Sequence, residues 1–326
     1  MKKIIYLLIL ILLGFFIFFF SFKEDKKNNL NKIKVAEVAH SIFYAPFYVS
    51  IENGYFKNHG LDINLILTSG ADKVSAAVLS GDVSIGFAGA ESAIYVYKGG
   101  EKNYLQIFSG LTKRDGQFIV GRKNETNFSL NSLIGKEIIV GRKGGMPALN
   151  FLNALENEEI NYKDININYQ IDFASLSGAF IGGTGDYVNL FEPNATMLEK
   201  NSQGFTLIPI GKYSGEMPYT TFYAKKSYIK DNPNIIKNYV AAIDDGLNYV
   251  SNHSASEIAK VISKQFPDTS INDLTKMIQH YKDADSWLDN SHVNKKSFEN
   301  LEEVLLKNNL IDSYVPYNKL VINFEK

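Results

Sequence analysis

The sequence predicts an α/β protein of two lobes that are joined by two extended chain crossings. Short apolar strands and helices alternate from residue 33 onward, which is typical of helices packed over a largely parallel sheet. Two extended runs, residues 117–122 and 220–225, divide this alternation into two units. The 326 residues suffice for two cores. A single doubly wound domain is the alternative that periodicity leaves open.

The first unit alternates four strands with three helices. Gly54 and Gly60 end the first helix and the turn after it, because glycine readily adopts the conformation that stops a helix. The predicted strands are residues 33–39, 62–68, 83–88 and 105–111, and the predicted helices are residues 45–53, 71–80 and 91–98.

The second unit has the same alternation, and helices follow it. Its strands are predicted at the turn and strand of residues 133–141, at 165–170 and at 187–191, with helices at 147–156 and 175–181. The helices after the second crossing are predicted at residues 233–252, 255–265, 271–282 and 295–308. Lobe I therefore comprises residues 33–117 and 225–326, and lobe II comprises residues 118–224 with both hinge segments.

Residues 4–22 form an apolar segment without charge, preceded by Lys2 and Lys3. A helix of 19 residues just spans a hydrocarbon core of about 30 Å, and the lysines favour a cytoplasmic N-terminus. The sequence predicts an anchor over residues 1–22 and a flexible linker over 23–32. The protein would then face the extracellular side of the membrane. Cleavage as a signal peptide, which would make it secreted, is the alternative, although no A-x-A-like site follows.

Composition excludes several kinds of site. The 34 basic and 35 acidic side chains create no field that would attract nucleic acid. The chain has no cysteine, which rules out a lipidated cysteine, a disulfide and a thiolate metal site. Its five histidines lack metal-ligand spacing, so we predict neither a metal nor a cofactor.

Several motifs carry a resemblance to a known family over roughly residues 33–310. They are YAPFY from Tyr44, ENGYF from Glu52, LSGDVSIGFAG from Leu79, LIGKEI from Leu133 and FEP from Phe191. The chain resembles the solute-binding proteins related to the thiamine-pyrimidine synthases, which include binding proteins for sulfonates, taurine, nitrate and pyrimidine precursors. This resemblance implies the bilobed type II periplasmic-binding-protein fold. It also implies monomeric capture of a small molecule for an ABC permease and its ATPase.

The expected binding residues follow the strands, because ligands of such α/β folds bind at the carboxyl ends of strands and at helix N-termini. Aromatic residues there could stack on a planar ligand. The candidates are His40, Ser41, Phe43, Tyr44, Ser69, Gly70, Ala88, Gly89, Ala90, Glu91, Gly144, Gly145, Met146, Glu192, Tyr219 and Trp287. A plain helix cap is the alternative role of each capping residue.

Three of these positions bear on the ligand class. The turn from Gly141 to Pro147 offers backbone N–H groups, but it has Gly145 and Met146 where sulfonate- and nitrate-binding members usually have hydroxyl side chains. Glu192 could accept paired hydrogen bonds from an aminopyrimidine, or it could cap a neighbouring helix. We therefore expect a thiamine-pyrimidine precursor or a similar heterocycle, with sulfonate, taurine or nitrate anions as the alternative.

An enzymatic role is the third possibility that the resemblance raises. Synthases of this fold need a lysine to carry the cofactor and a nearby histidine, and the matching positions here are Ala88 and Ser92. The stretch that matches their cysteine-rich patch, residues 214–218, has no cysteine. We therefore expect a binding protein and not an enzyme.

Overall fold

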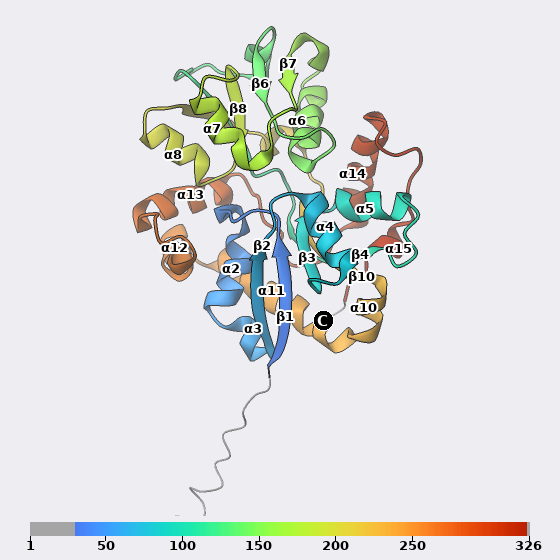
Figure 1. The fold of residues 1–326 in the computed structure, drawn as a ribbon. Helices are drawn as coiled ribbons and strands as arrows, with labels where there is room; N and C mark the ends of the chain where they lie inside the picture. Colours follow the sequence, from blue (N-terminus) through green and yellow to red (C-terminus); the bar gives the residue numbers. More distant parts are fainter. Residues whose placement is uncertain (1–29, 325–326) are drawn as a thin grey trace, which may run out of the picture. The chain divides into compact units, whose positions relative to one another are not determined.

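Two five-stranded sheets organise the chain in the computed structural model, which describes residues 30–324 (Figure 1). In the first sheet the strand order is β2-β1-β3-β10-β4. Strands β1, β2 and β3 run parallel, and β10 pairs antiparallel with β3 and β4. These strands are β1 (Asn31–Glu37), β2 (Leu61–Leu67), β3 (Ile85–Gly89), β4 (Leu105–Thr112) and β10 (Thr220–Lys225).

The second sheet repeats this plan with the order β7-β6-β8-β5-β9. Strand β6 runs parallel to β7 and β8, while β5 pairs antiparallel with β8 and β9. The strands are β5 (Phe118–Gly121), β6 (Glu137–Ile139), β7 (Asn166–Asn168), β8 (Tyr187–Leu190) and β9 (Phe205–Pro209). Each sheet thus contains one antiparallel strand that lies next to a chain crossing.

The two crossings are shorter than the sequence predicts. Residues 117–122 and 220–225 are expected as extended hinge segments, and most of them form β5 and β10, which lie inside the sheets and are almost wholly buried. Their backbone N–H and C=O groups pair with neighbouring strands because unpaired buried groups are costly. The links between the sheets are residues 113–117 and 215–219. Strand β10 belongs to the first sheet, although the predicted second lobe extends to residue 224.

Helices flank both sheets. Those that follow strands of the first sheet are α2 (Ala45–Glu52), α3 (Tyr55–Asn58), α4 (Ala71–Ser80) and α5 (Glu91–Lys98). Those between strands of the second sheet are α6 (Met146–Asn157), α7 (Leu176–Ile181) and α8 (Asn194–Lys200). Helix α9 (Gly211–Ser214) follows β9, the last strand of this sheet along the chain. The C-terminal helices are α10 (Lys226–Asp231), α11 (Pro233–Asn252), α12 (Ala255–Ile262), α13 (Ile271–Asp283), α14 (Lys295–Lys307) and α15 (Tyr317–Leu320). The 3-10 turns are η1 (Ile42–Tyr44), η2 (Leu130–Leu133), η3 (Tyr162–Asp164), η4 (Phe173–Ser175) and η5 (Ser263–Gln265).

Aromatic packing fills the interior of the first sheet. Phe87 on β3 and Phe222 on β10 stack at a centroid distance of 4.2 Å. Phe47 on α2 and Tyr239 on α11 close over this pair at 5.1–5.2 Å. The second sheet has an additional core cluster that includes Phe151 of α6. Each sheet therefore has packed apolar support for the loops at its edge.

No helix among residues 30–324 is long and apolar enough to cross a bilayer. The predicted anchor, residues 1–22, lies outside the described residues, as does most of the predicted linker.

Candidate functional site

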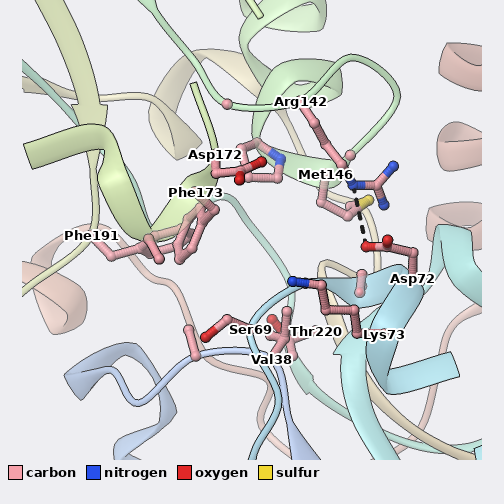
Figure 2. Close-up of a pocket in the computed structure, with 18 of the residues that line it drawn as sticks. Val38, Ser69, Asp72, Lys73, Arg142, Met146, Asp172, Phe173, Phe191 and Thr220 are labelled. Carbon is pink, nitrogen blue, oxygen red and sulfur yellow. Dashed lines mark ion pairs between the residues drawn. The ribbon is translucent and has the colours of Figure 1, made fainter. Parts of the chain in front are cut away.

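A cavity of about 250 Å³ lies where the strand ends of both sheets meet (Figure 2). From the first sheet, its wall comes from residues after β1, β2 and β3. From the second sheet, it comes from residues after β6, β7 and β8. Parallel strands place their carboxyl ends at one edge of a sheet, so both edges contribute loops and helix N-termini.

Residues after β1 and β2 of the first sheet form part of one wall. Val38 and Ala39 follow β1, and Ser69 and Gly70 lead into α4. Gly70 has a φ of 119°, a conformation that glycine adopts readily and that other residues rarely do. This conformation places the first turn of α4, with its free backbone N–H groups, against the cavity.

The Gly-rich turn of residues 141–147 forms the opposite wall. Gly141 and Gly144 have φ values of 83° and 79°, which lets the chain fold back before α6 begins at Met146. The Tyr95 hydroxyl on α5 donates a 2.8 Å hydrogen bond to the Gly144 carbonyl. This bond ties the turn of the second sheet to a helix of the first.

Aromatic rings line the other side of the cavity. Phe173 of η4 and Phe191 at the end of β8 lie 5.7 Å apart between ring centroids, and Figure 2 shows them side by side. Tyr219, before β10, lies 6.2 Å from Phe191. Such a surface can pack against the face of a planar ligand.

Charged side chains flank the cavity. Arg142 Nε and Asp72 Oδ1 lie 3.8 Å apart, marked by the dashed line in Figure 2. Both are well exposed, so this pair contributes at most about 1 kcal/mol. Lys73 and Asp172 also line the cavity. The site thus offers charges of both signs near its mouth.

Glu91, the first residue of α5, is a buried carboxyl group in the cavity wall. Its side chain is 1% exposed, and its Oε2 has no hydrogen-bond partner among the described residues. Burial raises the pKa of Glu91 to about 7, opposed by Arg142 and by the backbone N–H groups of Glu91, Met146 and Ser92. This carboxyl can therefore change its charge near neutral pH.

Two tyrosines complete the buried wall. Burial raises the pKa of Tyr44 and of Tyr219 above its usual range. Asp115, in the first link between the sheets, lies beside Tyr219, and burial raises the pKa of Asp115 to about 8. Both tyrosines stay neutral at physiological pH and can donate or accept hydrogen bonds.

The structure brings half of the predicted residues to this cavity. Those that line it are Tyr44, Ser69, Gly70, Gly89, Glu91, Gly145, Met146 and Tyr219. Those that lie outside its lining are His40, Ser41, Phe43, Ala88, Ala90, Gly144, Glu192 and Trp287.

Glu192 lies outside the lining of this cavity and is bonded within the protein. Its side chain is fully buried and accepts hydrogen bonds from the Thr196 N–H at 2.9 Å and the Thr196 hydroxyl at 2.8 Å. His280 Nδ1 lies 2.9 Å from Glu192 Oε1, the same oxygen that accepts the bond from the Thr196 hydroxyl. The carboxylate therefore caps α8 and joins it to α13, which is the helix-cap alternative for this residue.

The other outlying residues are also engaged in packing. Trp287 donates from Nε1 to the Phe43 carbonyl at 2.8 Å. Ser41 donates to the Glu192 carbonyl at 2.7 Å, and His40 Nδ1 lies 2.9 Å from Glu37 Oε1. Ala88 and Ala90 are wholly buried beside Gly89. The Gly144 carbonyl is bonded to Tyr95, as described above.

Several further cavity residues lie outside the list of candidate binding residues, although Gly141, Arg142 and Pro147 belong to the turn that the sequence analysis singled out. They are Val38, Ala39, Ala71, Asp72, Lys73, Gly141, Arg142, Pro147, Asp172, Phe173, Ala174, Ser175, Phe191 and Thr220. Residues 172–175 follow β7, so the strand-end rule that found Ser69 and Gly70 could have found them. Among residues 30–324 no group of three or more acidic or histidine side chains could hold a metal ion.

Comparisons with known proteins identify the family of this chain. The family model described as NMT1/THI5 like matches residues 42–256. YtlA of Bacillus subtilis, named as a binding protein, is 40% identical over 297 residues, which cover 91% of this chain and 89% of YtlA.

Solved structures share the fold at low sequence identity. The alkanesulfonate-binding protein SsuA of Xanthomonas axonopodis pv. citri, bound to MOPS, has a TM-score of 0.72 at 13% identity, covering 90% of this chain and 98% of SsuA. The aliphatic sulphonate-binding SsuA of Escherichia coli has a TM-score of 0.68 at 14% identity, covering 89% and 97%. This chain has the periplasmic-binding-protein fold and belongs to the NMT1/THI5-like family.

Proposed function

We propose that this protein is the solute-binding component of an ABC importer and captures a small molecule in the cavity between its two sheets. The observation that carries this proposal is the cavity itself, whose wall combines strand ends and helix N-termini from both sheets. Membership of a family that includes a named binding protein supports it. Capture would occur outside the cytoplasm, with residues 4–22 as an anchor and a permease with its ATPase as partners.

Binding would work by closure of two halves about the links at residues 113–117 and 215–219. Contacts already join the two sheets around the cavity, including Tyr95 with Gly144 and Arg142 with Asp72. A ligand that touches both walls binds the closed form more tightly than the open form and therefore shifts the equilibrium towards closure. A permease would then recognise the closed monomer.

The lead ligand is a thiamine-pyrimidine precursor or a similar small heterocycle. Phe173, Phe191 and Tyr219 provide ring surfaces for a planar molecule, and Met146 provides an apolar contact. Glu91 supplies a carboxyl group, the hydrogen-bond acceptor that an amino heterocycle needs. A synthase-like activity is a weaker alternative, because Ala88 and Ser92 replace the required lysine and histidine.

A small anion such as a sulfonate, taurine or nitrate is the second candidate. Lys73 and Arg142 line the cavity, and so do first-turn residues of α4 and α6, where free backbone N–H groups can bind an anion. Two structural relatives are named as sulfonate-binding proteins.

A thermal-shift screen of the full chain in mild detergent would test the proposal. The panel would contain 4-amino-2-methylpyrimidine, riboflavin, taurine, MOPS and nitrate, with glucose as a control. A concentration-dependent rise in Tm with one class supports solute binding, because a ligand that binds only the folded state stabilises it. An unchanged Tm at millimolar concentrations of every compound would contradict the proposal.

A further inference from the structure

Helix α8, which belongs to the half of the molecule with the second sheet, lies beside α13 of the other half (Figure 1). Three residues of α13, Asp273, Lys276 and His280, follow one another at intervals of three and four positions, so they share one face of the helix. Each of them has a partner on α8 or just before it. The three pairs are Lys200 Nζ with Asp273 Oδ2 at 2.6 Å, Lys276 Nζ with Glu199 Oε2 at 3.5 Å, and His280 Nδ1 with Glu192 Oε1 at 2.9 Å.

Glu192 is the buried centre of this contact. Its carbonyl oxygen accepts a 2.7 Å hydrogen bond from the Ser41 hydroxyl, and its N–H donates to the Tyr281 hydroxyl at 2.9 Å. Ser41 follows β1, and the Tyr281 ring lies 5.2 Å from the Phe43 ring of η1, so both partners belong to the first half. Glu192 is thus joined to the first half through its N–H, its carbonyl and, at His280, its side chain. The side chain is fully buried, so separation of the halves here would leave buried polar groups without partners.

The contacts on the α6 side of the cavity are more exposed. Figure 1 shows α6 and α14 on the right of the molecule, whereas α8 and α13 lie on the left. Two ion pairs join the halves on this side, Arg142 with Asp72 at 3.8 Å and Lys307 with Glu156 at 2.7 Å. The four side chains are between 45% and 64% exposed, so water screens both pairs and solvates the groups when they part. The hydrogen bond from α5 to the Gly-rich turn, described above, is the third contact here.

The contact at Glu192 also lies near the links between the sheets. Phe118, which directly follows the first link, pairs with Leu190 of β8, and Glu192 comes two residues later. Strand β6, which leads into the turn of residues 141–147, lies on the far side of β8 from β5. In a rotation about the links, displacement grows with distance from the axis. The turn of residues 141–147 therefore moves further than Glu192 does.

We propose that the contact of Glu192 and α8 with α13 is a pivot, so that the cavity opens only on the side where the turn of residues 141–147 meets α4. The inference rests on the proposed closure and adds its direction and the route of the solute. Helix α8 keeps its place on α13 in both the open and the closed form. A solute enters between Arg142 and Asp72, whose ion pair parts as the cavity opens.

Distances between pairs of spin labels test this direction, because the chain has no cysteine of its own that would take a label. The pair N201C and N272C reports across α8 and α13. The pair A76C and K143C reports across the opening between α4 and the turn. All four positions are exposed. Electron-resonance distances would be measured in the full chain in mild detergent, without addition and with 4-amino-2-methylpyrimidine, taurine or MOPS.

The two pairs should respond differently to a bound compound. With at least one of the three compounds, the distance between labels at positions 76 and 143 should shorten by more than about 2 Å, as in hinge closure. The distance between positions 201 and 272 should stay the same. Shortening across both pairs would overturn the pivot and leave solute capture intact.

A second comparison tests the pivot without any ligand. H280A removes one bond between Glu192 and α13 and should broaden the distribution of distances between positions 201 and 272. H292A is the matched control and should behave as wild type, because His292 is exposed and its side chain has no bond among residues 30–324. K276E, which places a negative charge beside Glu199, is the second variant should H280A unfold.

The remaining outcomes separate the pivot from the proposed function. An unchanged distribution in both H280A and K276E would overturn the pivot, whatever the compounds do. Unchanged distances across both pairs with every compound would count against closure on a solute, and the comparison of H280A with wild type would still decide the pivot.

Discussion

Replacement of Asp115 by asparagine should stabilise the protein at high pH. Asp115 is 1% exposed, and its Oδ1 accepts a hydrogen bond from the Gln117 N–H. Burial raises the pKa of Asp115 from 3.8 to about 8. The folded chain therefore binds this proton more tightly than the unfolded chain, and stability falls as pH rises from about 4 to 8.

The structure sets the size of this effect. A shift of about four pKa units corresponds to about 5 kcal/mol, and relaxation around a buried charge reduces this to roughly 2–5 kcal/mol. The variant D115N keeps the amide-accepting oxygen and cannot ionise. The difference in unfolding free energy between D115N and wild type should be near zero at pH 4 and reach its full value at pH 9. Glu91 titrates in both proteins, so its contribution cancels in the difference.

Urea unfolding at pH 4, 7 and 9, followed by the fluorescence of Trp287, measures this difference. The exposed D289N is the matched control and should change stability by less than about 0.5 kcal/mol at each pH. A difference between D115N and wild type that does not change with pH would refute the reasoning. So would a D115N protein that is less stable than wild type at pH 9.

Three glycine variants test the packing and the site. G246A should lower the free energy of unfolding in urea by roughly 3 kcal/mol, because a Cβ would lie 2.2 Å from the Pro46 carbonyl oxygen. A decrease of less than about 1 kcal/mol would contradict the packing of α11 on α2. G178A should raise the free energy of unfolding by about 0.5–1 kcal/mol, because no atom lies within 4 Å of the new methyl group in α7. A lower free energy of unfolding would show that the alanine is strained there. G89A should displace the Glu91 carboxyl group, with little change in Tm. The affinity for any ligand that wild type binds, measured by calorimetry, should fall at least about 10-fold. An unchanged affinity would argue against this placement of Glu91 in the cavity wall.

Much of the fold could be predicted because helix and strand signals are strong and local. The bounds predicted at residues 71–80, 91–98 and 233–252 match α4, α5 and α11. Strand β9 was missed because its five residues are all half-buried, so no alternation of buried and exposed positions marks it. The pairing of β5 and β10 within the sheets depends on long-range contacts that local sequence does not encode.

The site could be predicted at the level of loops but not of side chains. Strand ends identified Ser69, Gly70 and Gly89 because backbone topology places them at one edge. Side-chain direction at the end of a strand is set by packing, so sequence could not tell that the Glu192 carboxyl group bonds Thr196. Phe173 was not among the candidates, although it follows β7 and the same strand-end rule applies to it.

Hydrogen exchange with mass spectrometry tests the central claim most directly. Exchange of the full chain would be compared with and without the compound that gives the largest thermal shift. Capture between the two sheets predicts slower exchange both in residues 69–73 of the first sheet's edge and in residues 141–147 and 172–175 of the second. Protection confined to one of these edges, or protection only at residues far from the cavity, would contradict capture between the two sheets.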